Sequence, residues 1–347
     1  MKTMNNKSFW VTISSRGFSN EDNLIKLIKY NPVGIRINTG RDTYEWAANA
    51  ISSLVKNSYP AEKIFLDVGN NKPRIRINSK TEELFVKKDD TFSISNEATS
   101  DTRVTSSTFF KKIKVNDIIV FGDGQFEAVV VNIDNDTFFL KSLSSGNIND
   151  RMALSIKNNN FSFFYIGEEE ADDVKKILNS HKINLIISFV EDVENIKSCQ
   201  TRFSNAAMIV PKIETLLAVN NIDEILSYSK LVLLGRGDLA LSVGIEKIGL
   251  IQKRILKIAK KHSADVIIGT GTLMSLNYSA IPFRNEIIDI TNSYLNGASG
   301  IMLTSETGAS KTPFKFIDCL LSILDYLHKA EQSNEYDAFN DDNLHVK

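Results

Sequence analysis

The chain is poor in the residues that mark several classes of protein. It has 2 cysteines, 6 prolines and 17 glycines among 347 residues, which excludes a disulfide framework, a cysteine-rich zinc site and a collagen-like chain. Charge of one sign is also lacking, because 41 basic residues stand against 42 acidic ones. No nucleic acid and no anionic membrane is therefore an expected partner, and any anion site must be local.

Long apolar runs are missing as well. The first residues, MKTMNNKSFWVTIS, lack the apolar core of a signal peptide. The longest apolar runs, NLIISFV and KLVLLG, are far shorter than the roughly 20 residues of a membrane-spanning helix. Both cysteines, Cys199 and Cys319, lie in helix-like stretches, as suits a reducing compartment. We expect a cytoplasmic protein.

Short apolar runs alternate with helix-length amphipathic segments along nearly the whole chain. This pattern is typical of parallel strands buried on both faces. The predicted strands are 9–14, 33–38, 63–68, 184–190, 206–213, 230–235, 265–270 and 300–304. The predicted helices are 21–30, 43–56, 168–180, 191–200, 215–227, 246–262, 284–296 and 314–330. Eight strand–helix pairs predict a closed (β/α)₈ barrel.

One interruption, after the third strand, has a different texture. Thr, Ser, Phe and Val alternate in LFVKKDDTFSIS and IIVFGDGQFEAVVVNI, with the turn signals GDG, DND and SSGN between such runs. We interpret residues 77–162 as a small antiparallel β domain that acts as a lid, and residues 1–76 with 163–332 as the barrel. The polar tail, 333–347, is expected to be disordered.

Polar residues at the carboxyl ends of the strands are candidates for an active site, because barrel enzymes build their sites there. No histidine occupies such a position, which argues against a His-based triad or a zinc site. The candidates are Ser14, Ser15, Arg36, Asn38, Asp67, Ser188, Lys212, Glu214, Arg236, Asp238, Thr270 and Thr304 to Glu306.

The run PKIET carries the sharpest signal. Lys212 and Glu214 are two residues apart on one strand and point to the same side, and Asp238 follows the next strand in GRGDLAL. In isolation a Lys-X-Glu is usually a solvated surface pair, but the aliphatic neighbours mark a buried strand. Two carboxylates on adjacent strand ends suit Mg²⁺ or Mn²⁺, and a Gly-flanked turn at 235–238 offers backbone donors to an anion.

Several of these stretches together resemble the pyruvate kinase family. They are VGIRINTG, FLDV, PKIETLLAVNNIDEIL, LLGRGDLAL, IIGTGTLMSL and FRNEIIDITNSYLNGASGIMLTSET, in the family's order and with similar spacing. The resemblance covers residues 9–330, including NDIIVFGDGQFEAVV in the insertion. It implies the same barrel with its inserted β domain and a transfer of the phosphoryl group of phosphoenolpyruvate to a nucleoside diphosphate.

The resemblance also implies roles for individual residues. Lys212 would assist phosphoryl transfer, and Glu214 and Asp238 would hold the metal. Arg36 and Arg76 would contact the phosphoryl group, and Thr270 would lie near the carbon that is protonated. The remaining substrate contacts would be Asn38, Asp67, Ser188, the backbone amides of Gly237 and Asp238, and Asp123 in the insertion.

Departures from the family pattern predict differences in the site. Gly40 and Val68 stand where the potassium-dependent enzymes have Ser and Thr, and Arg74 stands in place of a glutamate. The fixed guanidinium could replace the charge of K⁺, so we expect activity without K⁺. The segment 270–276, Glu191 and the region near Arg41 also depart, which leaves the phosphoryl acceptor open.

The chain stops about where the barrel would end, so we expect that the family's C-terminal domain is missing and that any homo-oligomer uses barrel faces. Two other classes stay open at this point. The same barrel could serve a metal-dependent lyase or aldolase that handles pyruvate enolates, or a binding protein that has lost catalysis. The intact set Arg36, Lys212, Glu214, Asp238 and Thr270 argues against the latter.

Overall fold

The computed structural model describes residues 8–40, 42–69, 72–77, 83–95, 102–104, 109, 111–122, 124–150, 152–157 and 164–333. Two expectations from the sequence lie outside these ranges. They are the role of Asp123 and, beyond Ser333, the disorder of the tail.

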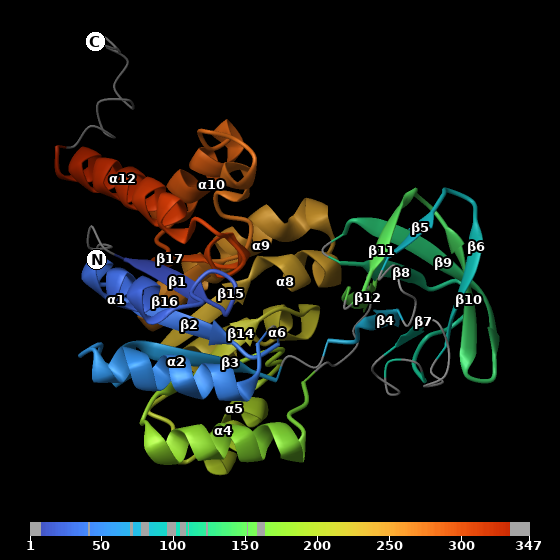
Figure 1. The fold of residues 1–347 in the computed structure, drawn as a ribbon. Coiled ribbons are helices and arrows are strands. Elements are labelled where there is room, and N and C mark those ends of the chain that lie inside the picture. The colour runs from blue at the N-terminus through green and yellow to red at the C-terminus, as the bar shows by residue number, and fades with distance from the viewer. Residues whose placement is uncertain are drawn as a thin grey trace, which may run out of the picture.

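Eight parallel strands close into a barrel, as predicted (Figure 1). Around the barrel they run β1-β17-β16-β15-β14-β13-β3-β2. Their bounds are β1 Phe9–Ile13, β2 Gly34–Asn38, β3 Ile64–Val68, β13 Asn184–Ile187, β14 Ile209–Ile213, β15 Leu231–Gly235, β16 Asp265–Gly269 and β17 Gly300–Leu303. Each matches one apolar run of the sequence, so the (β/α)₈ prediction is confirmed.

Large side chains fill the interior of the barrel. The inner cluster consists of Trp10, Phe65, Ile186, Val210, Leu233, Ile267 and Met302. Trp10 fits because strands on both sides carry glycine: a Cβ at Gly34 would lie 2.3 Å from its ring, and one at Gly300 would lie 2.9 Å from its Nε1. The barrel is therefore a packed core rather than a channel, and polar groups are left to the strand ends.

Helices cover the outside of the barrel and bury their apolar faces on it. Side chains of Asn20, Thr43, Asp192 and Thr215 cap four of them by accepting from backbone N–H groups in the first turn. The helices are α1 Glu21–Tyr30, α2 Tyr44–Lys56, α4 Glu168–Ser180, α5 Val193–Arg202, α6 Leu216–Asn220, α7 Ile222–Tyr228, α8 Arg236–Val243, α9 Ile248–His262, α10 Arg284–Leu295, α11 Ser305–Gly308 and α12 Pro313–Gln332, with short 3₁₀ turns at Ala61–Lys63, Ile245–Lys247 and Met274–Asn277.

Two local expectations about the helices are wrong. The segment after β15 was expected to be a turn but forms α8, because Leu239, Ala240 and Val243 give it a buried face. The helix expected over 215–227 is broken at Asn221, whose side chain donates to the carbonyl of Glu191 at 2.9 Å. Both differences lie near the carboxyl ends of the strands.

The insertion after β3 forms its own sheets beside one end of the barrel (Figure 1). A seven-stranded sheet runs β12-β8-β9-β10-β6-β7-β4, and β11 pairs with β5. The strands are β4 Ile75–Ile77, β5 Glu83–Val86, β6 Thr91–Ser95, β7 Thr102–Val104, β8 Ile118–Phe121, β9 Phe126–Asp134, β10 Thr137–Ser142, β11 Gly146–Asn149 and β12 Leu154–Ile156. The pairs are antiparallel as expected, except that β6 and β7 pair in parallel.

The sheets of the insertion enclose a hydrophobic core of their own, built around Phe109, Phe121, Phe126 and Phe138. On the barrel side, β12 lies next to α8. The described helices include none with the length and apolarity that a bilayer crossing requires.

Candidate active site

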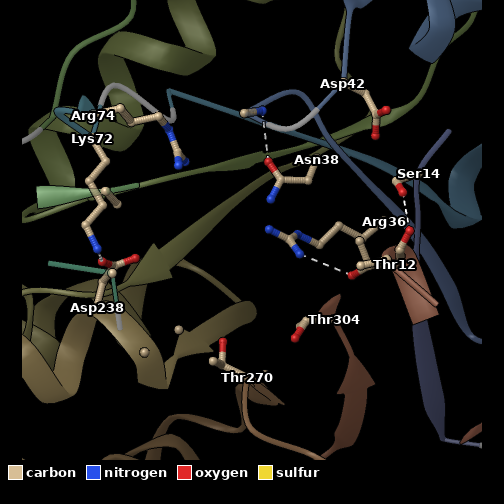
Figure 2. A pocket seen from close by; sticks show the side chains of 18 of the residues that line it. Thr12, Ser14, Arg36, Asn38, Asp42, Lys72, Arg74, Asp238, Thr270 and Thr304 are labelled. Carbon is tan, nitrogen blue, oxygen red and sulfur yellow. Dashed lines mark hydrogen bonds and ion pairs between the residues drawn. The ribbon is translucent and has the colours of Figure 1, made fainter. Parts of the chain in front are cut away.

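A cavity of about 580 Å³ lies at the carboxyl ends of the barrel strands and reaches the inserted sheet. Its size suits a small ligand. Figure 2 shows Lys72, Arg74 and Asp238 on one side of it, facing Arg36 and Thr12 on the other. The residues nominated from the sequence that the structure brings to this cavity are Ser14, Ser15, Arg36, Asn38, Arg74, Arg76, Lys212, Glu214, Gly237, Asp238, Thr270 and Thr304.

Lys212 lies at the centre of a buried ionic cluster. Its Nζ donates to Asp67 Oδ2 at 3.1 Å and to Ser188 Oγ at 2.9 Å, and lies 3.3 Å from Glu214 Oε1. Burial alone would lower the pKa of Lys212, but Asp67 and Glu214 outweigh it and raise the pKa. The ammonium is therefore charged and held in place at the wall of the cavity.

Asp67 and Ser188, expected to contact substrate, lie one layer behind the cavity wall. Asp67 is fully buried and accepts from Arg36 Nε at 2.7 Å and from Ser188 Oγ at 2.8 Å. Burial would raise its pKa, but Lys212 and Arg36 outweigh burial and lower it. Neither residue lines the cavity. We therefore interpret both as groups that orient Arg36 and Lys212 rather than as substrate contacts.

Glu214 follows β14 and turns into the cavity. Its Oε2 accepts the backbone N–H of Phe189 at 3.1 Å. Gly235 makes room for it, because a Cβ there would lie 2.7 Å from Glu214 Cγ. Burial raises the pKa of this carboxyl to about 7, against the lowering effect of Lys212. A bound cation would favour the ionised form of the group.

Asp238 lies in the first helical turn of α8, whereas the sequence had predicted a non-helical loop turn there. Gly237 and Asp238 are therefore the second and third residues of a helix, where backbone N–H groups have no partner in the helix and can bind an anion. The carboxylate of Asp238 accepts a hydrogen bond from Lys72, a residue that sequence reasoning missed. Burial would raise the pKa of Asp238, but Lys72 above all, with Lys212, lowers it.

Thr270 follows β16 in a left-handed backbone conformation, with φ +72°. This conformation is unfavourable for a residue with a Cβ and needs support from its surroundings. Arg236 supplies it: its Nη2 donates to the carbonyl of Thr270 at 2.7 Å and its Nε to that of Gly269 at 3.1 Å. Asp289 of α10 binds the same guanidinium through both oxygens, at 2.8 and 2.7 Å.

The inserted sheet contributes the second wall. Arg76 of β4 forms an ion pair with Asp150 at 3.2 Å, and both side chains are partly exposed. Arg74 precedes β4, lines the cavity and helps to lower the pKa of Asp238. Asp150 was not predicted, because it lies in a polar stretch of the insertion with no strand-end signal.

A third part of the cavity lies over the ends of β1 and β2. Asn38 Oδ1 accepts the backbone N–H of Gly40 at 3.0 Å. Asp42 accepts the backbone N–H of Ser15 at 3.1 Å through Oδ1, while its Oδ2 is buried with no hydrogen-bond partner in the described part of the chain. Asp42 was not nominated, since it follows a loop and not a strand.

The donor set fits a magnesium-type ion rather than zinc. Two carboxylates from adjacent strand ends, Glu214 and Asp238, line the cavity. Within the same residues no three His, Cys, Asp or Glu side chains gather as a metal cluster. Mg²⁺ is commonly bound by one or two carboxylates, with the remaining ligands from water and substrate.

These features define a (β/α)₈-barrel enzyme with a cation-rich, two-carboxylate site at the mouth of the barrel. A family model described as the barrel domain of pyruvate kinase matches residues 7–317. The chain thus belongs to the pyruvate kinase family.

Individual pyruvate kinases are similar to this chain in sequence and in structure. The pyruvate kinase of Pyrobaculum aerophilum is 28% identical over 314 residues, covering 87% of this chain and 67% of the relative. That of Chlamydia muridarum is 27% identical over 328 residues, covering 90% and 67%. The crystal structure of pyruvate kinase from Pyrobaculum aerophilum superimposes with a TM-score of 0.76 at 25% identity, over 92% of this chain and 73% of that one.

Proposed function

We propose that the protein transfers the phosphoryl group of phosphoenolpyruvate to ADP and releases pyruvate. The observation that carries this proposal is the convergence of Arg36, Lys212, Glu214 and Asp238 on one cavity. Three segments far apart in the sequence supply these side chains: β2, the end of β14 and the start of α8. The family match gives their combination a specific chemistry.

Arg36 and Lys212 bind the phosphoryl group in this proposal. Both are held from behind by Asp67, so they present fixed positive charge without reorganising. The bond from phosphorus to the enol oxygen breaks, and a new bond forms to an oxygen of the β-phosphate. Lys212 stabilises the charge that develops during this step.

Glu214 and Asp238 would hold Mg²⁺ or Mn²⁺, which would supply a Lewis-acid charge to neutralise the substrate oxygens. The N–H groups at the start of α8 bind the substrate carboxylate. Thr270, fixed by Arg236, orients a water that delivers a proton to the methylene carbon of the enolate. This proton completes pyruvate.

The acceptor would enter over the ends of β1 and β2, where Asn38 and Asp42 line the cavity. Arg74 lines the wall formed with the insertion and carries a permanent charge close enough to affect Asp238. We therefore expect that the reaction does not need K⁺. Addition of KCl at constant ionic strength should leave the rate unchanged, and a tenfold activation would refute this part of the proposal.

The test is direct. The protein is incubated with phosphoenolpyruvate, Mg²⁺ and a panel of nucleoside diphosphates, and pyruvate is measured. Pyruvate should form with at least one acceptor. Lys212→Met should reduce the rate by roughly 10³-fold or more, whereas Lys197→Met, at an exposed pair on α5, should not change it. Absence of pyruvate with every acceptor would overturn the proposal, and turnover of pyruvate plus an aldehyde would identify an aldolase instead.

A further inference from the structure

Lys72 is a buried cation that no part of the proposed reaction uses. Its side chain is only 5% exposed, and its ammonium binds Asp238 Oδ1. Figure 2 shows Lys72 reaching along the cavity to Asp238. A lysine this buried needs a counter-charge, and among the described residues Asp238 is the carboxylate that Lys72 contacts.

The backbone around Lys72 belongs to the inserted sheet rather than to the barrel. The next residue, Pro73, accepts the N–H of Leu154 in β12 at 2.8 Å, and Arg74 forms a β-bridge with Ala153. Asp238 lies in α8 of the barrel. The pair Lys72–Asp238 therefore ties the sheet to the barrel directly at the cavity.

Asp238 also belongs to the carboxylate pair that would hold a divalent ion. An ammonium and a divalent cation repel each other, so they compete for one carboxylate unless an anion lies between them. The cavity already holds Arg36 and Lys212, which Asp67 and Glu214 balance. An anionic substrate would provide the counter-charge that Lys72 loses when Asp238 turns to the metal.

We propose that Lys72 is a tethered cation that occupies Asp238 in the metal-free protein and moves to the phosphoryl group of the substrate when a divalent ion binds. Lys72 is then a substrate-binding residue delivered by the inserted sheet. This inference rests on the proposed function for the position of the metal. It predicts opposite effects on two binding steps, which a merely structural lysine would not produce.

The experiment measures binding rather than turnover. Mn²⁺ affinity is determined by electron paramagnetic resonance, first alone and then with phosphoenolpyruvate present. Lys72→Met should bind Mn²⁺ alone about tenfold more tightly, as expected if Lys72 holds Asp238 nine-tenths of the time. The same variant should bind phosphoenolpyruvate about tenfold more weakly in the Mn²⁺ complex.

Two controls and one substitute variant make the result decisive. Lys72→Arg keeps the charge and should shift both affinities less than Lys72→Met. Lys157→Met removes an exposed lysine of the inserted segment, paired with Glu127, and should shift neither. If Lys72→Met does not fold, as judged by circular dichroism, Lys72→Gln replaces it with the same expectations.

Asp238→Asn separates the two proposals. It should weaken Mn²⁺ binding strongly, and unchanged Mn²⁺ binding would overturn the metal site of the proposed function together with this inference. If Asp238→Asn weakens binding but Lys72→Met leaves Mn²⁺ affinity unchanged or lowers it, the role of Lys72 alone is overturned.

Discussion

The two walls of the cavity are built differently. On the barrel wall, the charged groups Arg36, Asp67, Lys212 and Glu214 are nearly inaccessible to water and bind one another. On the wall formed by the insertion, the pair Arg76–Asp150 is open to solvent, with side-chain exposures of 38% and 22%. The barrel therefore fixes its charges in advance, whereas Arg76 and Asp150 of the insertion are held loosely; Lys72, buried against Asp238, is the exception on that side.

Because of this difference, the charged side chains of the barrel wall are rigid, whereas the solvated ones of the insertion can rearrange. Buried charges in a low dielectric act strongly and need partners on every side. Solvated charges on the sheet cost little to rearrange. This arrangement suits a reaction centre built on the barrel and an inserted sheet that acts as a lid over it.

The largest difference in stability and activity is expected between substitutions of Arg36, on the barrel wall, and of Arg76, on the insertion wall. Arg36→Met leaves Asp67 short of a partner in a buried site and should lower the free energy of unfolding by about 3–5 kcal/mol. It should also reduce kcat for pyruvate formation by roughly 10³-fold. Urea unfolding followed by circular dichroism measures the first effect. A loss of stability no greater than that of Arg76→Met would contradict the contrast.

The second effect is the pH dependence of metal binding, which tests the buried carboxylate Glu214 of the barrel wall. Burial raises the pKa of Glu214 to about 7, and a metal binds the ionised carboxylate. Mn²⁺ affinity should therefore fall as pH decreases through 7, by up to about tenfold per pH unit. Titration of Mn²⁺ between pH 5 and 8 measures it. Glu214→Gln should bind more weakly and lose this dependence; a variant that keeps it would show that another group titrates.

On the insertion wall the expected effect is smaller. Arg76→Met should raise KM for phosphoenolpyruvate about five- to tenfold and change stability by less than about 1 kcal/mol, because its ion pair is solvated. Asp150→Asn serves as the matched variant, since it frees Arg76 without removing the guanidinium and should leave KM nearly unchanged. Equal losses in the two variants would mean that the pair, not Arg76 itself, matters.

The smallest effect is expected where the acceptor would enter. Asp42 brings a carboxylate to a region that must receive a diphosphate, and its Oδ2 has no hydrogen-bond partner among the described residues. Asp42→Asn should lower KM for ADP about threefold, because like charges in a partly solvated site repel only weakly. Steady-state kinetics with varied ADP measure this. A rise in KM would show that Asp42 binds the acceptor.

Much of the fold could be predicted because buried parallel strands read as aliphatic runs. The positions of Lys212, Glu214 and Asp238 followed from the strand ends in the same way. Lys72 and Asp150 could not be found like this, because they reach the site from the inserted sheet, and no periodicity in the sequence encodes how that sheet sits on the barrel. The available signal was that Lys72 lies two residues before Arg74, a position that departs from the family pattern.

The helix α8 shows a different limit. Glycines at 235 and 237 favour a turn by composition, whereas the apolar face formed by Leu239, Ala240 and Val243 favours a helix. Packing decided the outcome. The burial of Asp67 behind the cavity wall could not be predicted either, because a strand-end position does not show whether a side chain lines the cavity or lies behind its wall.

Trp10, wedged between Gly34 and Gly300, has a practical consequence. The chain has 2 tryptophans, and both lie in the barrel half of the molecule, Trp10 in β1 and Trp46 in α2. The sequence from 77 to 162 has none. Indole fluorescence therefore reports on the barrel alone. Unfolding of the inserted sheet would not change this signal, but amide hydrogen exchange would detect it.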